Sequence, residues 1–242
     1  MEEFIRLSKL LSSKGICSRR DADLYIQKGW VFVDGQVVNQ LGTKVKKDAK
    51  IELSRRLEAT LQNKVTIILN KPLGYVSCMP EDGYEPAITL ITAENQYKHS
   101  SKRLEHSHLE KLAVAGRLDI NSKGLLIFTQ CGVIAKKLIG ENSPIEKEYF
   151  VRVDKAISPE MIHSLEHGLS LDGQALKKAR VKVFSDTTFH IVLVEGKKRQ
   201  IRRMCELVGL ETLEIKRLRI GKIKLGDLPV GQWRYLQPHE TF

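Results

Sequence analysis

The segment best suited to chemistry is a short loop between two apolar runs, within residues 114–129. Arg117 and Asp119 lie two residues apart in this loop, and Gly116 and Gly124 flank them. Glycine lets the backbone turn sharply or approach another group closely. A carboxylate held in such a loop could attack a carbon atom or move a proton. The same acid and base could equally form an ordinary ion pair of a turn, so these residues alone leave both interpretations open.

A basic segment near the C-terminus predicts a helix with one apolar face. The spacing i, i+3, i+4, i+7 defines that face, and four residues follow it: Ile201, Met204, Cys205 and Val208. Three basic residues lie off this face: Arg199, Arg202 and Arg203. Because a guanidinium matches the geometry of phosphate oxygens, charge alone makes all three candidates for phosphate binding.

Residues 147–153 predict a strand, because apolar and polar side chains alternate there. The alternation puts Tyr149 on the same face as Val151 and Val153. A tyrosine of the hydrophobic core would show the same pattern. The strand alone therefore does not distinguish a core residue from one that contacts a ligand.

Residues 4–60 predict a small module of two helices and a hairpin. Leucines spaced i, i+3 and i+4 indicate the first helix. Ser18, with Asp21 three residues later, fits the capping box that begins a second helix. Asp34-Gly35, between two apolar runs, is typical of a hairpin turn.

The start of this second helix is a candidate anion-binding site. Free backbone N–H groups and the helix dipole favour a negatively charged group there. Four basic residues lie in its first turn or are expected on the preceding helix: Arg19, Arg20, Arg6 and Lys9. A solvated surface would carry such residues too.

The composition favours a partner that carries negative charge. The chain of 242 residues has 40 Lys and Arg against 29 Asp and Glu, a formal net charge of +11. We expect nucleic acid as this polyanion, ahead of a membrane surface. No uncharged apolar run approaches the roughly 18 residues of a membrane helix, so no membrane partner is expected. The N-terminal residues show no targeting pattern, and we expect the protein in the cytoplasm.

The pattern along the chain predicts two domains, residues 4–60 and 64–242. The boundary falls near residues 54–64, where a polar segment precedes a new apolar strand. The length allows one small and one medium domain, each with its own core. The polar segment 95–111 between apolar runs is expected at the surface.

Neither a metal site nor a disulfide framework is expected. His163 and His167 have the i, i+4 spacing of two ligands on one helix, but no third ligand has evident spacing. The four cysteines are scattered and form no C-x-x-C pair. Three further histidines fall in the polar segment and are expected to be exposed: His99, His106 and His108.

Five motifs, in order along the chain, resemble one family. Residues 5–46 resemble an S4 RNA-binding domain. The central loop, G-R-L-D-x-x-S-x-G-L-L-I-F-T, resembles the signature loop of the pseudouridine synthases that carry an N-terminal S4 domain. Three more segments resemble a strand, a second strand and a helix of that family: Lys71–Val76, Glu146–Tyr149 and Gly196–Met204. One departure follows Thr129, where Gln130 and Cys131 replace the Asn and the acid or His usual in the family.

The resemblance implies an α+β fold, with a small S4 (α-L) domain and then a mixed, mostly antiparallel sheet with flanking helices. It implies that Asp119 is the catalytic residue and that Arg202 is the partner that keeps its carboxylate ionised in a buried site. Tyr149 would stack on the flipped uracil or relay a proton. No cofactor or metal is implied, because turning uridine into pseudouridine changes neither oxidation state nor composition.

The same resemblance gives other residues binding roles. Arg117 would fill the gap left by the flipped base or hold its phosphate, and Ile201 would pack beside Tyr149 against the base. Arg199 and Arg203 would bind RNA phosphates. The S4 domain would hold RNA with four residues: Arg6, Lys9, Arg19 and Arg20.

The implied function is site-specific isomerisation of uridine to pseudouridine in ribosomal RNA. The family includes type A, which acts on small-subunit rRNA, and types B, E and F, which act on large-subunit rRNA. The motifs are closest to type F, which favours 23S over 16S rRNA. The expected partner is ribosomal RNA or a ribosomal assembly intermediate, and the expected state is a monomer.

Two other functions fit parts of the sequence. The alternative is a non-catalytic S4-type rRNA-binding or ribosome-assembly factor, since the basic charge and the S4 module suit both. A hydrolase with a lone carboxylate is disfavoured, because such enzymes usually need a second acid.

Overall fold

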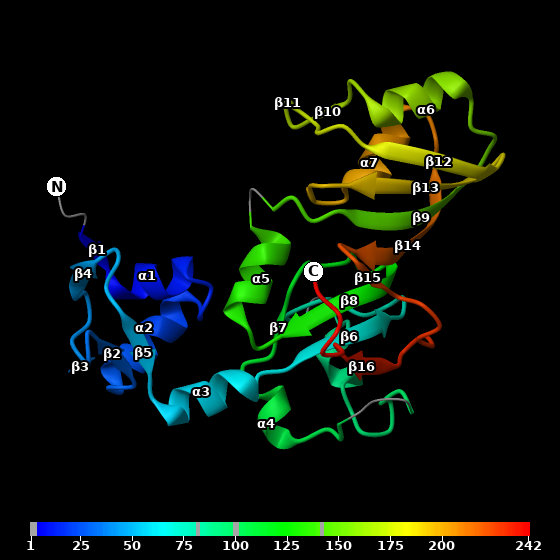
Figure 1. Cartoon of the computed structure of the whole chain (residues 1–242). Coiled ribbons are helices and arrows are strands. Elements are labelled where there is room, and N and C mark those ends of the chain that lie inside the picture. Colours follow the sequence, from blue (N-terminus) through cyan, green and yellow to red (C-terminus); the bar gives the residue numbers. More distant parts are fainter. Residues whose placement is uncertain (1–3, 81–82, 99–101, 141–142) are drawn as a thin grey trace.

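The computed structural model of the chain describes residues 4–80, 83–98, 102–140 and 143–242 (Figure 1). A small N-terminal module lies to one side of a larger body, and the helix α3 (Arg55–Gln62) connects them. The module starts with β1 (Phe4–Arg6), α1 (Leu7–Ser13) and α2 (Arg19–Gln27). Four short strands follow: β2 (Val31–Val33), β3 (Gln36–Val38), β4 (Lys44–Lys46) and β5 (Ile51–Leu53).

Local signals of the sequence account for these elements. The Ser18 hydroxyl accepts a hydrogen bond from the Asp21 N–H at 3.1 Å and so caps α2, as predicted. Asp34 and Gly35 have φ of 50° and 81°, the positive values that a two-residue hairpin turn of type I′ requires between β2 and β3. Arg6 differs from its prediction. It ends β1, which pairs with β4, and does not lie on the first helix.

The module has an apolar core of its own. The buried faces of α1 and α2 meet Val31 of β2 and Leu57 of α3 in one cluster. Two contacts then fix the module against the larger body. Lys64 Nζ pairs with Asp21 Oδ2 at 3.0 Å. A Cβ added to Gly132 would lie only 2.4 Å from the Cβ of Ser18, so the N-terminal ends of α2 and α5 (Gly132–Ile139) approach closely.

The larger body is built on a mixed sheet, to which the described residues contribute nine strands. Seven of them follow one another across the sheet: β12 (Arg180–Ser185), β13 (Thr188–Leu193), β9 (Lys147–Val153), β14 (Thr212–Ile220), β8 (Lys123–Thr129), β6 (Thr66–Lys71) and β16 (Trp233–Tyr235). Two short strands pair at its sides: β7 (Ala113–Val114) with β8, and β15 (Ile223–Lys224) with β14. Only β14 and β8 pair in parallel among these, so the predicted α+β class is confirmed.

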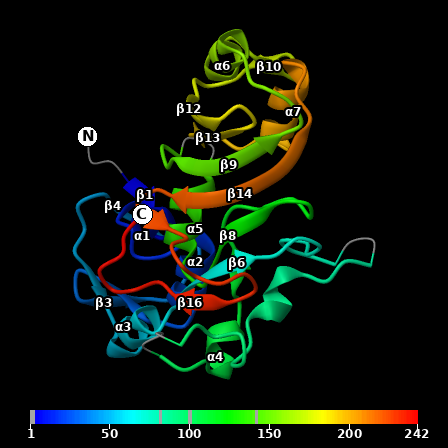
Figure 2. The same ribbon diagram turned by 90° about the vertical axis from the view of Figure 1, so that its right-hand side faces the viewer.

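Two apolar clusters lie on opposite faces of this sheet. Ile67 and Ile68 are successive residues of β6, and they belong to different clusters because strand side chains alternate. On one face, α6 (Pro159–Glu166) and α7 (Gln200–Leu207) pack over β9 and β13. On the other, α5 packs over β6 and β8. The strands β9 and β14 run side by side between the two halves of the sheet (Figure 2).

Shorter elements connect the strands. They are the 3-10 helix η1 (Ala87–Leu90), the helix α4 (His106–Leu109) and the hairpin of β10 (Ser170–Leu171) and β11 (Gln174–Ala175). Gln130, at the departure from the family pattern, joins α4 to the start of β6. Its side chain accepts from the Val65 N–H at 3.0 Å and donates to the carbonyls of Ser107 and Glu110 at 2.7 and 2.8 Å. No described helix is long and apolar enough to cross a membrane.

Besides that of Arg6, three predictions about local structure are wrong. β6 ends at Lys71, and residues 72–77 form a loop because Pro72 cannot donate to a neighbouring strand and Gly74 has a φ of 82°. The helix of the basic segment begins at Gln200 and not earlier. His108 is buried, with its Nδ1 2.7 Å from the Tyr235 hydroxyl, and is not a surface residue. His99 lies outside the described residues.

Candidate active site

Asp119 lies half-buried in the loop between β7 and β8. Its neighbour Leu118 is held through both backbone polar groups. The Leu118 N–H donates to Ser77 Oγ at 2.8 Å, and the Ser77 hydroxyl donates to the Leu118 carbonyl at 2.6 Å. On the other side, the Gly74 N–H donates to the Ile120 carbonyl at 3.0 Å. The loop after β6 therefore fixes the backbone on both sides of Asp119.

Arg217 of β14 braces the same loop from the interior of the protein. Its side chain is almost fully buried. Its three nitrogens donate to three carbonyls: Nη2 to Gly116 at 2.9 Å, Nη1 to Arg117 at 3.3 Å and Nε to Leu125 at 2.7 Å. Because each of these nitrogens has an acceptor, the buried guanidinium is satisfied without a carboxylate partner.

Gly124 allows β14 to approach the start of β8 closely enough for Arg217 to form these hydrogen bonds. The two strands pair in parallel, with Arg217 opposite Gly124. A Cβ at position 124 would lie 2.4 Å from the Arg217 carbonyl oxygen, and the backbone there has a φ of +105°. Both the close approach and the left-handed backbone therefore require glycine at this position.

Two buried lysines add positive charge to the site. Lys71, at the end of β6, donates from Nζ to the Pro72 carbonyl at 2.8 Å. Burial lowers the pKa of Lys71 from 10.5 to about 8; the Asp119 carboxylate opposes this shift and Arg217 adds to it. Burial and Arg217 likewise lower the pKa of Lys147 on β9. Asp119 thus lies within electrostatic reach of a buried cation that the sequence patterns did not indicate.

Arg202 reaches the same loop from α7. It is only 8% exposed, and its Nη2 donates to the Asn121 carbonyl at 2.7 Å, two residues from Asp119. Its Nη1 donates to the Thr212 carbonyl at 3.0 Å, while Nε has no partner among the described residues. Burial lowers the pKa of Arg202, Arg199 lowers it further and Asp119 raises it. Asp119 and Arg202 are therefore close, although the described residues show no direct ion pair between them.

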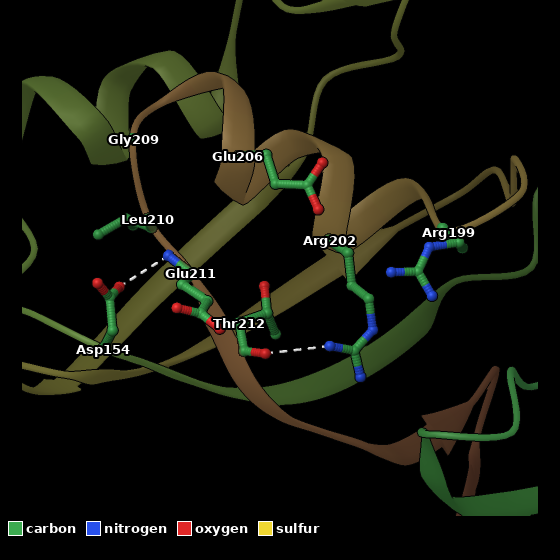
Figure 3. Close-up of a pocket in the computed structure, with 8 residues that line it drawn as sticks. All are labelled: Asp154, Arg199, Arg202, Glu206, Gly209, Leu210, Glu211 and Thr212. Atoms are coloured by element: carbon green, nitrogen blue, oxygen red, sulfur yellow. Dashed lines mark hydrogen bonds between the residues drawn. The ribbon is translucent and has the colours of Figure 1, made fainter.

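A pocket of about 410 Å³ lies next to Arg202, between α7 and the start of β14 (Figure 3). In Figure 3, Arg202 points from α7 toward Thr212, and the Arg199 guanidinium lies on the side facing Arg202. Arg199 is exposed and has a φ of 51°, an unusual backbone conformation for a residue with a side chain. Such conformations occur often at functional sites, where the surrounding structure maintains them. Asp154, Glu206 and Glu211 bring negative charge to the same pocket.

The structure places Tyr149 on β9 and Ile201 on α7. Both are buried and belong to the apolar cluster between the sheet and α7. The Arg217 guanidinium carbon lies 6.0 Å from the centre of the Tyr149 ring, at the outer limit of a cation–π contact. The aromatic ring and the loop of Asp119 therefore share Arg217 as a neighbour.

The remaining candidates lie at the surface or have other partners. Arg117 is exposed, two residues before Asp119. Arg203 donates two hydrogen bonds to the Asp172 carboxylate, at 3.0 and 2.6 Å, so its guanidinium is already paired. The four basic candidates of the N-terminal module are all exposed: Arg6, Lys9, Arg19 and Arg20. The described residues hold no group of three or more His, Cys, Asp or Glu suited to a metal ion.

Three contributors to the site were not predicted from the sequence: Lys71, Ser77 and Arg217. Lys71 is the first residue of the motif at residues 71–76, and Ser77 directly follows it. The motif therefore drew attention to their positions, but it did not predict their contacts with the Asp119 loop. The sequence did not indicate that Arg217 belongs to the site, because a basic residue in a strand normally occupies an exposed position. Its acceptors at residues 116 and 117 are about a hundred positions away along the chain.

Comparison with known proteins agrees with this geometry. Residues 65–207 match the RNA pseudouridylate synthase family, and residues 5–51 match the S4 domain. The dual-specificity RNA pseudouridine synthase RluF of Escherichia coli is 37% identical over 98% of this chain and 77% of its own length. The ribosomal large subunit pseudouridine synthase B of Bacillus subtilis is 33% identical over 98% of this chain and 93% of its own length. A crystal structure of a pseudouridylate synthase matches the fold with a TM-score of 0.65 at 22% identity, over 96% of each chain.

The chain belongs to the RNA pseudouridylate synthase family. Its mixed sheet, its supported aspartate loop and its N-terminal S4 module agree with this assignment. The protein is an RNA pseudouridine synthase with an N-terminal S4 domain. The family, the fold and the enzyme class predicted from the sequence are confirmed.

Proposed function

We propose that this enzyme converts one specific uridine of 23S ribosomal RNA to pseudouridine and that Asp119 is its catalytic residue. One observation carries the assignment of Asp119: its loop is held by Ser77 on one side and Arg217 on the other, next to the cations Lys71 and Arg202. The name of the Bacillus subtilis relative, which specifies the ribosomal large subunit, supports the choice of RNA.

The reaction breaks the bond between N1 of uracil and C1′ of ribose, rotates the base and forms a bond between C5 and C1′. The hydrogen on C5 leaves as a proton and N1 gains one, so composition and oxidation state are unchanged. Asp119 can assist as a nucleophile toward carbon or by moving a proton on the ribose. Fixing its backbone from both sides keeps the carboxylate in place while the base moves.

Neighbouring side chains receive supporting roles in this proposal. Arg202 and Lys71 are positioning residues that stabilise the negative charge of Asp119 in a partly dry site. Tyr149 lies against the extruded uracil with Ile201 beside it. Arg117 lies next to Asp119 on the same loop, where it occupies the gap left by the base or holds its phosphate.

Guanidinium groups at the surface bind the phosphates of the RNA in this proposal. Arg199, at the rim of the pocket, binds a phosphate near the target, and Arg203 does so once it leaves Asp172. Residues 4–60 dock the RNA through the basic residues of the S4 domain, and residues 64–242 carry out the chemistry. The enzyme acts as a monomer in the cytoplasm on rRNA or on a ribosomal assembly intermediate.

The test is the variant Asp119→Asn, which removes the charge but keeps the size of the side chain. Formation of the C5 bond releases tritium from 5-tritiated uridine, so release from 23S rRNA lacking this modification reports each turnover. We expect the wild type to release one tritium per target site and the variant essentially none, with RNA affinity retained. Asp227→Asn, at an exposed aspartate, is the matched control and should release tritium normally.

Near-normal release by Asp119→Asn would overturn the catalytic assignment. If the wild type released tritium from 16S rRNA but not from 23S, the choice of substrate would be wrong. Release from neither RNA nor from assembly intermediates would leave a non-catalytic rRNA-binding factor as the function.

A further inference from the structure

One face of the sheet carries aromatic and basic side chains that the catalytic proposal does not use. On the strands β12, β13, β9 and β14, four directly paired residues form a row across the sheet: Lys182, His190, Phe150 and Lys216. Neighbouring strands are about 4.8 Å apart, so the row spans about 14 Å. Two rings therefore lie between two lysines.

Phe184 extends this row into an aromatic platform. Its ring centre lies 4.3 Å from that of His190, and Lys182 Nζ lies 5.2 Å from the centre of the Phe184 ring. Phe150 contacts His190 edge-on, with ring centres 6.1 Å apart. We use the name platform for these five residues: Phe150, Lys182, Phe184, His190 and Lys216.

The platform lies on the uncovered face of these strands. Tyr149 and Val151 point to the opposite face, where α6 and α7 pack on them. Neither Phe150 nor Phe184 belongs to any apolar cluster of the described residues, and Phe184 remains 55% exposed. In Figure 1, these strands lie in front of α7. An exposed ring of this size contributes little to the core, so cross-strand pairing alone does not account for it.

The charges of the platform favour a negatively charged occupant. Lys182 and Lys216 have no carboxylate partner among the described residues, in contrast to Arg219 and Arg180 of the same face, which pair with Glu146. The His190 ring is fixed by Glu148, whose Oε1 lies 2.9 Å from Nδ1. The platform thus presents fixed rings for stacking and two lysines for phosphates.

We propose that the platform binds a single-stranded segment of RNA outside the catalytic cleft. Exposed aromatic side chains on a sheet, flanked by basic residues, stack about two or three bases of single-stranded RNA, and the lysines neutralise the phosphates. Since Phe150 follows Tyr149 in β9 and points to the other face, this segment is distinct from the one that holds the target uridine. The proposal rests on RNA as the substrate but not on which uridine is modified.

The first test measures binding of a fluorescent oligouridylate by anisotropy, using the full chain. Phe184→Ala should weaken binding about tenfold, the effect of losing one stacked base, while Phe184→Trp should retain it. Val183→Ala is the matched control: Val183 is the preceding residue, 40% exposed, and lies on the opposite face, so its variant should bind normally. Equal binding by Phe184→Ala and the control would overturn the proposal.

The second test concerns the lysines. Replacing both Lys182 and Lys216 with Ala should reduce the slope of log affinity against log salt by about 0.7 for each phosphate that is no longer bound. Lys222, in the turn between β14 and β15, and Lys224, the last residue of β15, provide the control pair. An unchanged slope for the platform variant would contradict the proposal. So would a 4-thiouridine cross-link map that excludes residues 180–190.

Two further readouts separate this inference from other outcomes. In the tritium assay, Phe184→Ala should keep the rate at saturating rRNA but require more rRNA for half the maximal rate. Loss of the maximal rate would instead indicate damage to the cleft and would count against a separate surface.

If sedimentation showed that Phe184→Ala dissociates a dimer, the platform would be a self-association surface and the RNA proposal would be wrong. Failure of the wild type to release tritium would refute the proposed function, yet Phe184-dependent oligouridylate binding would still support the platform.

Discussion

The surroundings of Asp119 carry more positive than negative charge, and they explain how a loop can hold the carboxylate that we propose as catalytic. Lys71 and Arg202 each interact with it electrostatically, and Arg217 holds its loop through carbonyl groups. The cations use backbone carbonyls as acceptors, so their charges are not fully neutralised by carboxylates. This leaves the site able to attract a phosphate of the substrate as well as to stabilise the aspartate.

Lys71 should make stability depend on pH above neutrality. Its folded pKa is about 8 and its ordinary value is 10.5, so the unfolded chain binds more protons between these values. The free energy of unfolding should therefore rise with pH across this window, by about 3 kcal/mol from this residue. Lys71→Met should remove the rise, as measured by urea unfolding at each pH. Lys222→Met, at a lysine of the β14–β15 turn, should keep it, and an equal rise in both variants would show that Lys71 is not responsible.

Arg202 should matter more for turnover than for RNA affinity. Arg202→Met removes the hydrogen bonds to Asn121 and Thr212 and leaves Asp119 less compensated, which corresponds to a loss of about 10²-fold or more in turnover. Tritium release at saturating rRNA and filter binding measure the two quantities. Arg203→Met, from the adjacent residue that pairs with Asp172, is the control and should keep turnover within severalfold. A parallel fall in affinity and turnover for Arg202→Met would instead mark Arg202 as a phosphate contact.

At the scale of the elements, the parallel contact of β8 with β14 holds the site together. Without the close approach at Gly124, Arg217 could not reach the carbonyls of Gly116 and Arg117. The loop after β6 then completes the support through Ser77. Three strands from distant parts of the sequence thereby converge on one short loop.

Gly124→Ala should destabilise the protein more than a glycine substitution in open space. The new Cβ would lie 2.4 Å from the Arg217 carbonyl oxygen, so the strands must separate in addition to the strain of a positive φ. We expect a loss of more than about 3 kcal/mol in the free energy of unfolding. Gly173→Ala, with a φ of +72° and no atom within 4 Å, should lose only about 1–2 kcal/mol from the backbone. Similar losses in the two variants, measured by urea unfolding, would show that the close approach is unimportant.

Sequence patterns predicted the elements whose signals are local. The strand of Tyr149 begins and ends as its alternation predicts, and Ser18 caps its helix through the predicted contact. Pro72 and Gly74 indicate the loop of residues 72–77, but the resemblance to a family strand outweighed that local signal. The burial of Lys71 and Arg217 could not be predicted, since it depends on carbonyl groups supplied by distant segments. For the same reason, only the resemblance placed Arg202 near Asp119.

At the scale of the whole molecule, the N-terminal module and the larger body have separate apolar clusters and are joined through α3 and a small set of contacts. The N-terminal module carries its basic residues at the surface, and the larger body carries the Asp119 loop. In the proposed function, RNA docking and chemistry depend on these different surfaces, which we expect to respond differently to mutation.

Replacing both Arg19 and Arg20 with Ala should weaken RNA binding without changing the maximal rate. Each phosphate that is no longer bound should reduce the salt dependence of binding by about one unit of slope. A filter-binding series in increasing salt measures this, and the tritium assay at saturating rRNA measures the rate. The double variant of Lys222 and Lys224 should behave like the wild type. Unchanged binding at every salt concentration would exclude these arginines from RNA docking.

The contact between Ser18 and Gly132 has a consequence for how the enzyme chooses its target. A Cβ at position 132 would collide with Ser18, so the two modules are seated against each other and not loosely tethered. With the S4 arginines as the proposed docking point for RNA, their separation from Asp119 is a fixed length, and we expect the enzyme to act as a ruler along its substrate. We expect a uridine one step nearer to or farther from this docking point to miss the carboxylate, whatever its sequence context.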